Sequence, residues 1–413
     1  MTGDVEAGTH ALQTTRNREK GHNADNREDD LEEGHTRAEQ RGQKAFKGKD
    51  KVTFCDRLKN LTWAWFTLTL STGGIALVLD CTPHRFPGLD IIGRVFYILD
   101  LFFFISIVAG ITARFVMMPS AIKTSLTRPT ESLFFSNFLL SAATILGNCS
   151  MYGGPATGQW LATTLRVCFW IYAAITTLSS ILQFFILFED GHLPIQSMNP
   201  AWVLPIFPAM MVGTLAAVIA PSQAPEHRLP ILTGGVAYIG LGLMVALLIY
   251  PLYLGRLMQH GLPAPAMRPG MFIPVGQMGY TAFALIEMSQ AIPDEYGYFA
   301  ENPLAVDTLK TVALWVGIWL WLLGFWFFAT SLLATVVVAV KWKLKFSLTW
   351  WAFIFPNVGL TIATINIGRG LGSKGVLWIS SAMTIMLCIA WFLIFVAHVR
   401  AYFMRKIMWP GRD

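Results

Sequence analysis

The stretch TWAWFTLTLSTGGIALVL, residues 62–79, is long and apolar enough to cross a lipid bilayer. A hydrocarbon core of about 30 Å needs roughly 20 consecutive apolar residues in a helix. The middle of this stretch nevertheless carries Ser71, Thr72, Gly73 and Gly74, a group of four that we call the waist. Contact with lipid does not require small or polar residues at this depth. The stretch therefore predicts a membrane helix whose middle faces other protein or a pathway.

The composition of the whole chain indicates a polytopic membrane protein. Of its 413 residues, 54% are hydrophobic and only 14% are charged, against roughly 25% charged residues in a soluble protein. The first 50 residues hold 9 Lys or Arg and 11 Asp or Glu, and such a segment cannot bury enough apolar surface to fold. We therefore predict a disordered cytoplasmic tail over 1–55, a membrane domain over 56–403 and a short cytoplasmic tail over 404–413.

Ten segments fit the length of a membrane span. They lie near 62–79, 91–113, 133–149, 161–188, 202–220, 230–255, 272–289, 309–340, 349–366 and 375–400. The eighth is too long for one perpendicular crossing, so it tilts or extends beyond the membrane. With the amino terminus inside, the inner loops, the carboxy tail and the segment from Arg41 to Lys59 together hold 19 Lys or Arg, against about 7 outside. This asymmetry predicts that both termini are cytoplasmic.

The odd-numbered spans differ from the even-numbered ones. Each odd span carries glycine, proline or polar residues at depth, whereas the even spans are longer and plainer. The odd spans begin near residues 62, 133, 202, 272 and 349, which is a spacing of 71, 69, 70 and 77 residues. This period predicts an all-α integral membrane fold of ten helices, arranged as five repeated hairpins around a central pore. Plain packing between helices is the alternative explanation for any single small residue.

Five motifs in the odd spans resemble a known family. They are WAWFTLTLSTGGIAL (63–77), PTESLFF (129–135), NPAWVLPIFPAMMVGTLAA (199–217), MFIPVGQMGYTAFALI (271–286) and WWAFIFPNVG (350–359). In this order they resemble the tellurite-resistance/dicarboxylate transporter family, and within it the fungal malic acid permeases. Plant slow anion channels and fungal sulfite pumps belong to the same family. The resemblance covers roughly residues 55–405.

The resemblance implies a substrate, an assembly and a gate. It implies a plasma-membrane protein, usually trimeric, that carries C4-dicarboxylates such as malate and succinate, with efflux of sulfite or another small anion as the alternative. The pore of the family is gated by a phenylalanine on the ninth helix, which corresponds by position to Phe355. One departure concerns the substrate. Malic acid permeases tend to have two prolines after the Val-Gly of span seven, whereas this chain continues with Gln277-Met278-Gly279.

The chemistry of the odd spans suggests how an anion would pass. A basic residue at midplane is costly to bury and would hold a dianion too firmly. Breaks at proline or glycine instead free backbone N–H groups and create half-helix N-termini, which favour carboxylates. Hydroxyl and amide side chains add further donors. The pathway candidates are Thr72, Gly73, Gly74, Pro205, Pro208, Pro274, Gln277, Thr281, Pro356, Asn357 and Thr361.

Ionisable residues within or beside the spans are candidates for coupling. Glu287 is a candidate to carry a proton with the anion or to pair with a neighbouring helix, and Arg369 is a candidate to attract anions at the outer mouth. Asp100 lies within the second span. Arg166, Lys310 and His398 lie near a membrane face, where we expect them to extend to the interface.

Other classes of protein fit the sequence poorly. The five cysteines lack metal-ligand spacing and no cluster of His, Cys or carboxylates suggests catalysis, so we expect no enzyme activity, metal or cofactor. The basic residues flank apolar segments, which argues against binding to nucleic acid. The outer loops are short for a receptor. The residues leave open whether transport is channel-like or coupled to protons.

Overall fold

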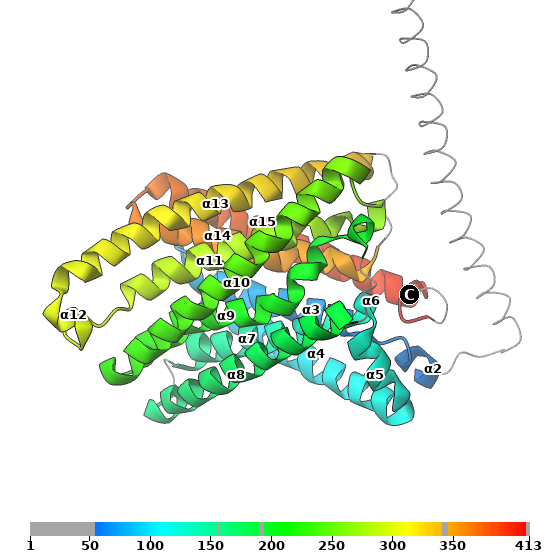
Figure 1. Cartoon of the computed structure of the whole chain (residues 1–413), viewed down its shortest axis with the longest axis horizontal. Helices are drawn as coiled ribbons and strands as arrows, with labels where there is room; N and C mark the ends of the chain where they lie inside the picture. The colour runs from blue at the N-terminus through cyan, green and yellow to red at the C-terminus, as the bar shows by residue number, and fades with distance from the viewer. Residues whose placement is uncertain (1–53, 155–156, 190–193, 341–345, 410–413) are drawn as a thin grey trace, which may run out of the picture. The chain divides into compact units, whose positions relative to one another are not determined.

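The computed structural model describes residues 54–154, 157–189, 194–340 and 346–409. The predicted tail over 1–55 falls almost entirely outside this part, as do Lys341, Lys343 and Lys345, which contributed to the predicted orientation. The chain divides into two units. One comprises residues 1–60 and 404–413 and contains helix α2 (Phe54–Leu58). The other, Leu61–Phe403, contains the long helices (Figure 1).

Five helices of the larger unit correspond to the odd-numbered spans, and a short helical turn precedes each. They are α3 (Phe66–Cys81) after η1 (Trp63–Trp65), α7 (Phe135–Asn148) after α6 (Pro129–Ser132), α9 (Phe207–Ile219) after η5 (Pro200–Ile206), α11 (Ile273–Gln290) after η7 (Pro265–Phe272), and α14 (Ile354–Gly370) after η8 (Leu348–Phe353). Pro208, Pro274 and Pro356 each lie in the first turn of an α-helix. Proline is tolerated there because the N–H that it lacks has no partner within the helix.

Five longer helices alternate with these along the chain. They are α4 (Leu89–Met117), α8 (Gln159–Glu189), α10 (Pro225–His260), α13 (Pro303–Val340) and α15 (Lys374–Phe403). The shorter elements are α5 (Ser120–Thr127), η2 (Cys149–Gly153), η4 (Ile195–Ser197), η6 (Ala220–Ser222) and α12 (Tyr298–Glu301).

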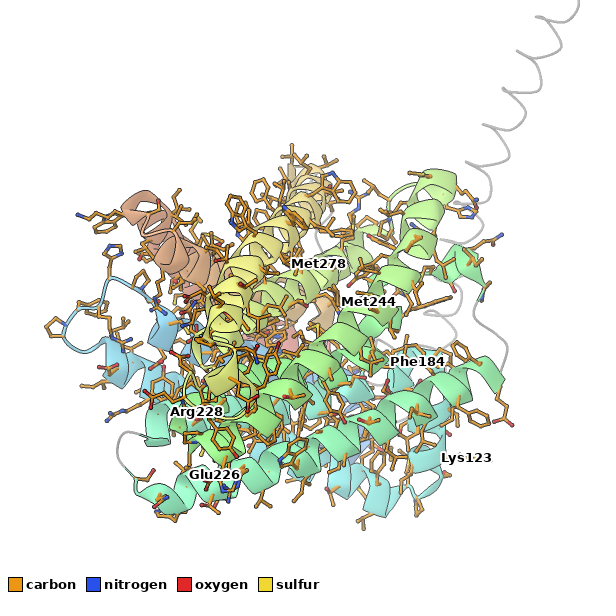
Figure 2. The ribbon with its side chains drawn as sticks, turned by 60° about the vertical axis from the view of Figure 1, so that its left-hand side comes forward. Lys123, Phe184, Glu226, Arg228, Met244 and Met278 are labelled. Atoms are coloured by element: carbon orange, nitrogen blue, oxygen red, sulfur yellow. The ribbon has the colours of Figure 1, made fainter. Side chains whose placement is uncertain are left out.

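Burial separates the two sets of helices. Buried residues make up 89% of the most apolar window of Trp63–Cys81 and 94% of that of Pro200–Ser222, but only 22% of that of α4 and 33% of that of α13. Two methionines illustrate the contrast: Met278 on α11 is fully buried, whereas Met244 on α10 is 60% exposed (both are labelled in Figure 2). The exposed side chains of the long helices are largely apolar. Such an exterior suits contact with lipid, as predicted for the even spans.

The buried helices contact one another in a closed ring. Helix α3 contacts α7, α7 contacts α9, α9 contacts α11, α11 contacts α14, and α14 returns to α3. Each of these inner helices also contacts the long helix that follows it in the chain. Figure 1 shows α13 along one edge of the bundle and α8 along the opposite edge. The core of this unit therefore lies among the irregular helices.

The described residues include eight helices that are long and apolar enough to cross a membrane. This result confirms the predicted multi-pass, helical membrane class, although the prediction was ten spans. The predicted spans 133–149 and 272–289 correspond to α7, of 14 residues, and α11, of 18 residues, which are not among the eight. The long eighth span is α13 with 38 residues, or about 57 Å at 1.5 Å per residue, which exceeds the hydrocarbon thickness.

Helices α11 and α14 approach each other closely at Gly276 and Gly279. A side chain at Gly279 would collide with the backbone of Gly359 and Leu360, and one at Gly276 would come 2.9 Å from the Cα of Pro356. Small residues allow this approach of two backbones, as is common between membrane helices. The approach fixes the position of the first turn of α14, which carries Phe355.

Candidate functional site

Phe355 lies where four of the inner helices meet. Its side chain is only 2% exposed. The ring of Tyr280 on α11 stacks on it with centroids 4.7 Å apart, and the ring of Phe207 on α9 meets it edge-on at 6.2 Å. From α3, a Cβ added to Gly74 would come 3.2 Å from Phe355 Cδ2. The residue predicted to be the gate therefore fills the space between α3, α9, α11 and α14.

The two glycines of the waist pack against different helices. Gly74 faces α14, where Phe355 and Val358 are its nearest neighbours. Gly73 faces α4 and α7: a Cβ at this position would come 2.5 Å from Asp100 Oδ2 and 2.9 Å from Thr144 Oγ1. The waist is therefore small because side chains approach α3 closely from both sides.

The two hydroxyl groups of the waist join helices. Ser71 donates a hydrogen bond of 3.0 Å to the carbonyl oxygen of Trp351, just before α14. Thr72 donates to Leu68 O (2.8 Å) and accepts a bond of 3.2 Å from the indole N–H of Trp391 on α15. Of the predicted pathway residues in α3, Gly74 is thus the one beside Phe355, and the hydroxyl of Thr72 is turned towards an outer helix.

The other polar pathway candidates also bond within the bundle. Thr281 donates to Gln277 O (2.7 Å) and Thr361 to Asn357 O (2.8 Å), each one turn back in its own helix. The amide of Gln277 donates to Gly242 O on α10 (3.0 Å), and that of Asn357 to Phe353 O (2.6 Å). The side-chain oxygens of Gln277 and Asn357 are buried without a hydrogen-bond partner.

The prolines lie in continuous helical turns. Pro205 is inside η5, whereas Pro208, Pro274 and Pro356 lie in the first turns of α9, α11 and α14. We expected broken helices with free backbone N–H groups at these positions. Instead, the N–H at each 3₁₀-to-α junction is bonded to a carbonyl of the preceding 3₁₀ turn: Phe207 to Leu204, Ile273 to Gly270 and Ile354 to Trp351. A 3₁₀ turn closes i→i+3 bonds and so uses donors that a broken helix would leave free.

Glu287 and Arg369 lie at the C-terminal end of the inner ring. Asn366 on α14 donates to Glu287 Oε2 on α11 (2.8 Å). One turn further along α14, Arg369 donates to Cys81 O at the end of α3 (2.7 Å). These two bonds connect α14 to both of its neighbours in the ring. A cation at the end of α3 also complements the negative end of its dipole.

One prediction about the membrane face is wrong. We expected His398 to extend to the interface, but its side chain is only 6% exposed. Its Nδ1 accepts a hydrogen bond of 2.9 Å from the indole N–H of Trp351, and its ring meets that of Trp65 edge-on at 4.9 Å. A partner within hydrogen-bonding distance satisfies the imidazole and makes its burial tolerable. Arg166 and Lys310 are half-buried.

Some buried polar groups in and beside the inner ring were not among the pathway candidates and have no hydrogen-bond partner. Asn137 Nδ2 on α7 and Thr214 Oγ1 on α9 lack a hydrogen-bond partner, and so do both carboxylate oxygens of Asp100 on α4. The signal in the sequence was a polar residue inside an apolar span. That signal does not distinguish partnered from unpartnered groups.

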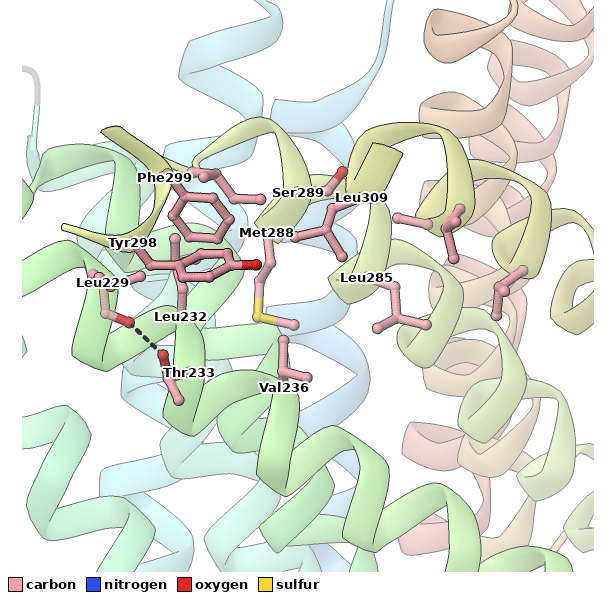
Figure 3. A pocket seen from close by; sticks show the side chains of 14 residues that line it. Leu229, Leu232, Thr233, Val236, Leu285, Met288, Ser289, Tyr298, Phe299 and Leu309 are labelled. Carbon is pink, nitrogen blue, oxygen red and sulfur yellow. Dashed lines mark hydrogen bonds between the residues drawn. The ribbon is translucent and has the colours of Figure 1, made fainter. Parts of the chain in front are cut away.

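An apolar pocket of about 620 Å³ lies elsewhere, between α10, α11, α12 and α13 (Figure 3). Most of its wall consists of aliphatic side chains such as Leu232 and Val236. The hydroxyl of Thr233 is turned to Leu229 O (2.9 Å). This wall offers a poor environment for a hydrated anion. In the described residues, no three His, Cys, Asp or Glu side chains are grouped so as to hold a metal ion.

These features define a class: a multi-pass helical membrane protein with a ring of buried, irregular helices inside a layer of apolar helices. Comparison with known families is specific. The chain belongs to the voltage-dependent anion channel family SLAC1, whose model matches residues 60–399. The resemblance found in the sequence motifs is confirmed at this level.

Individual relatives include transporters of different anions. The malic acid transport protein of Schizosaccharomyces pombe is 34% identical over 88% of this chain and 83% of its own length. The sulfite efflux pump SSU1 of Trichophyton rubrum is 27% identical over 87% of this chain and 95% of its own length. An uncharacterised transporter of Methanocaldococcus jannaschii is 26% identical over 76% of this chain and 84% of its own length.

Proposed function

We propose that this protein transports C4-dicarboxylate anions, with malate as the first substrate and succinate as the second, along the axis of the inner ring. The observation that carries the proposal is the place of Phe355, held between Gly74, Phe207 and Tyr280 from three other inner helices. The 34% identity to a malic acid transport protein supports the choice of substrate.

The proposed architecture is ten crossings arranged as five hairpins. Each inner helix contacts the outer helix that follows it, as a hairpin requires. Helix α7 is short, but α6 immediately precedes it and η2 immediately follows it. Helix α11 follows η7 directly. With these extensions both segments approach the length of a crossing.

The proposed gate is the aromatic contact around Phe355. A hydrophobic constriction can close a pore by excluding water, without a charged plug. Phe355 packs against α3 here, because a Cβ at Gly74 would come 3.2 Å from Phe355 Cδ2. Opening therefore requires the ring of Phe355 to move away from α3.

The proposed pathway runs past Gly74, Pro208, Pro274 and Pro356, with the amide of Asn357 two residues beyond the gate residue Phe355. We retain Thr72, Gly73, Pro205, Gln277, Thr281 and Thr361 as candidates that shape its wall through the bonds given above. Asn137 and Thr214 add unpartnered donor groups on α7 and α9. Neutral donors bind an anion weakly, which favours rapid passage.

Glu287 and Arg369 are proposed to control access at the outer mouth. Their bonds hold the C-terminal ends of α3, α11 and α14 together. Arg369 is exposed and carries the positive charge that attracts anions, whereas Glu287 opposes it or carries a coupled proton. We further propose a homotrimer in the plasma membrane with both termini in the cytoplasm, which rests on the family resemblance and on the distribution of Lys and Arg.

Sulfite efflux is the second candidate function. The 27% identity to a sulfite efflux pump covers 95% of that protein and favours a small inorganic anion. The Gln277-Met278-Gly279 sequence, where malic acid permeases tend to have two prolines, leaves this alternative open.

Reconstitution in liposomes tests the proposal. Fluxes of malate, succinate, sulfite and chloride are compared with and without a pH gradient, for the wild-type protein and for Phe355→Ala. We expect malate flux above that of empty liposomes and a larger flux for Phe355→Ala. Malate flux at background together with robust sulfite flux would replace the first candidate by the second. Equal fluxes for wild type and a folded Phe355→Ala would refute the gate.

A further inference from the structure

Asp100 occupies an unusual place on an outer helix. Most of α4 faces outwards, but its buried positions form one stripe: Leu89, Gly93, Phe96, Asp100, Ile107, Ile111 and Arg114. Asp100 lies in the middle of this stripe and its side chain is 0% exposed. An acidic residue thus occupies a core position of the α4 contact with the inner ring.

The carboxyl group of Asp100 faces the waist without a partner. A Cβ at Gly73 would meet Asp100 Oδ2 and Thr144 Oγ1 together, so both groups lie against the same point of α3. Neither carboxyl oxygen has a hydrogen-bond partner. The Thr144 hydroxyl donates to Ser141 O (2.9 Å), and the Asn148 amide donates to Gly73 O (2.9 Å).

No base neutralises this carboxyl group. The titratable and charged groups on the elements around it are Asp90, Arg94, Tyr97 and Arg114 on α4, Asp80 and Cys81 at the end of α3, Cys149 and Tyr152 after α7, and Lys374, Cys388, His398, Arg400 and Tyr402 on α15. None of them forms a hydrogen bond or ion pair with Asp100 in the described part of the chain. The imidazole of His398 is bonded to Trp351.

An ionised carboxylate is incompatible with this packing. Removing an unpaired charge from water is so costly that such groups are neutralised instead. The arrangement with Asp100 against Gly73 is therefore the arrangement of the neutral acid. Loss of the proton breaks the O–H bond and releases the proton to water. The carboxylate left behind then requires water or donors, which the contact between α3, α4 and α7 does not provide.

We propose that Asp100 is a proton-binding site that sets the position of the waist against Phe355. Gly73 and Gly74 are consecutive residues of α3: Asp100 on α4 packs against Gly73, and Phe355 on α14 packs against Gly74. Hydration of an ionised Asp100 separates α4 from α3 and moves both glycines. The neutral acid keeps the gate closed, and the ionised acid releases it. This inference rests on the proposed transport function.

The test measures anion current through reconstituted protein at about pH 5 to about pH 8. Titration of one group changes its ionised fraction by at most about tenfold per pH unit, and we expect wild-type current to rise with pH within that limit. Asp100→Asn is permanently neutral, so its current should be low and independent of pH. The matched control is Asp307→Asn on the exposed surface of α13, which should retain the wild-type response.

Two further variants make the outcome decisive. The double variant Asp100→Asn/Phe355→Ala should conduct at every pH, because the gate is absent. Asp100→Glu retains a titratable group and should shift the midpoint of the pH response. The midpoint of the pH response of Asp100→Glu can be measured even if Asp100→Asn does not fold. An unchanged midpoint in Asp100→Glu would overturn the inference.

The failure of this inference differs from the failure of the proposed function. If Phe355→Ala conducts anions and Asp100→Asn still responds to pH as the wild type does, the proton site is wrong and the transport function stands. A wild-type anion current that does not depend on pH would likewise show that the proton site is wrong while the transport function stands. If neither the wild type nor Phe355→Ala conducts any anion, both proposals fail.

Discussion

Tyr280 holds Phe355 through both its ring and its hydroxyl group. The two rings stack with centroids 4.7 Å apart and planes 27° apart, and the Tyr280 hydroxyl donates to the carbonyl oxygen of Phe355 (3.2 Å). One residue of α11 therefore fixes both the side chain and the backbone of the proposed gate. Gly359 makes room for it, because a Cβ there would come 2.7 Å from the ring of Tyr280.

Removing the Tyr280 hydroxyl should loosen the gate without emptying the site. Tyr280→Phe keeps the stacked ring but loses a hydrogen bond worth about 1 kcal/mol. We expect anion flux to rise several-fold, up to about fivefold for that energy, with unchanged preference among anions. Liposome flux assays measure both quantities. Tyr238→Phe is a control, because that hydroxyl lies on outer helix α10 and bonds to Thr177 on α8. A reduced flux in Tyr280→Phe would contradict this role.

The two glycines of the waist should respond differently to the same substitution. Gly74→Ala places a methyl group 3.2 Å from Phe355 Cδ2 and 3.4 Å from Val358 Cγ2, so these neighbours need to shift by only a few tenths of an ångström. We expect altered conductance with little loss of stability. Gly73→Ala places the methyl group 2.5 Å from Asp100 Oδ2 and 3.1 Å from Thr144 Cβ. Overpacking of this kind costs about 1–3 kcal/mol, so thermal unfolding should occur at a lower temperature.

A double variant identifies the cause of that loss of stability. If Asp100 is the obstacle, Asp100→Ala should restore part of the stability lost in Gly73→Ala. Residues in direct contact show coupling of about 0.5–3 kcal/mol in such a cycle. Thermal unfolding of the single and double variants in detergent gives the coupling. Strictly additive effects would show that the two residues do not meet.

Thr72 should contribute more to the stability of the fold than to the selectivity of transport. Its hydroxyl accepts the indole N–H of Trp391, and Thr72→Val leaves that buried donor unpartnered. An unsatisfied buried group costs about 1–3 kcal/mol. We expect lower thermal stability but an unchanged ratio of malate to chloride flux. Val is of nearly the same size, so a changed flux ratio in a stable variant would instead place the hydroxyl in the pathway.

The order of irregular and plain spans could be predicted from the sequence because it depends on local composition. Glycine, proline and polar residues at depth marked the five helices that form the buried ring. The resemblance carried by its motif singled out Phe355, and its role as a gate stays a prediction. The partners of the polar groups could not be predicted. Whether Thr72 faces a pathway or Trp391, 319 residues later, depends on the rotation of α3 within the bundle.

The sequence pattern also could not predict whether the backbone N–H groups near the prolines are free or hydrogen-bonded. A proline in an apolar span is compatible with a broken helix, with free N–H groups, or with the first turn of a new one. In the structure, 3₁₀ turns precede α9, α11 and α14, so these prolines lie in the first turns of helices. The residues before the prolines did not predict these 3₁₀ turns. The donor groups available to an anion are therefore fewer than the sequence suggested.

Charge at the end of the inner ring should change anion access in opposite directions. Glu287→Gln keeps an oxygen that can accept from Asn366 but removes a negative charge beside the proposed mouth. Arg369→Gln removes a positive one. We expect flux from that side to rise in the first and to fall in the second, by about two- to fivefold at low salt. Both effects should vanish near 1 M salt, where the screening length is about 3 Å.

Glu301→Gln on α12 is the matched control for these measurements, because Glu301 is exposed in the connection that follows α11. It removes the same charge outside the ring, so its effect should be small at every salt concentration. An equal effect from Glu301→Gln would mean that general surface charge controls access. If Glu287→Gln lowers flux and abolishes its dependence on a pH gradient, then Glu287 carries a proton during transport, and its role at the mouth is secondary.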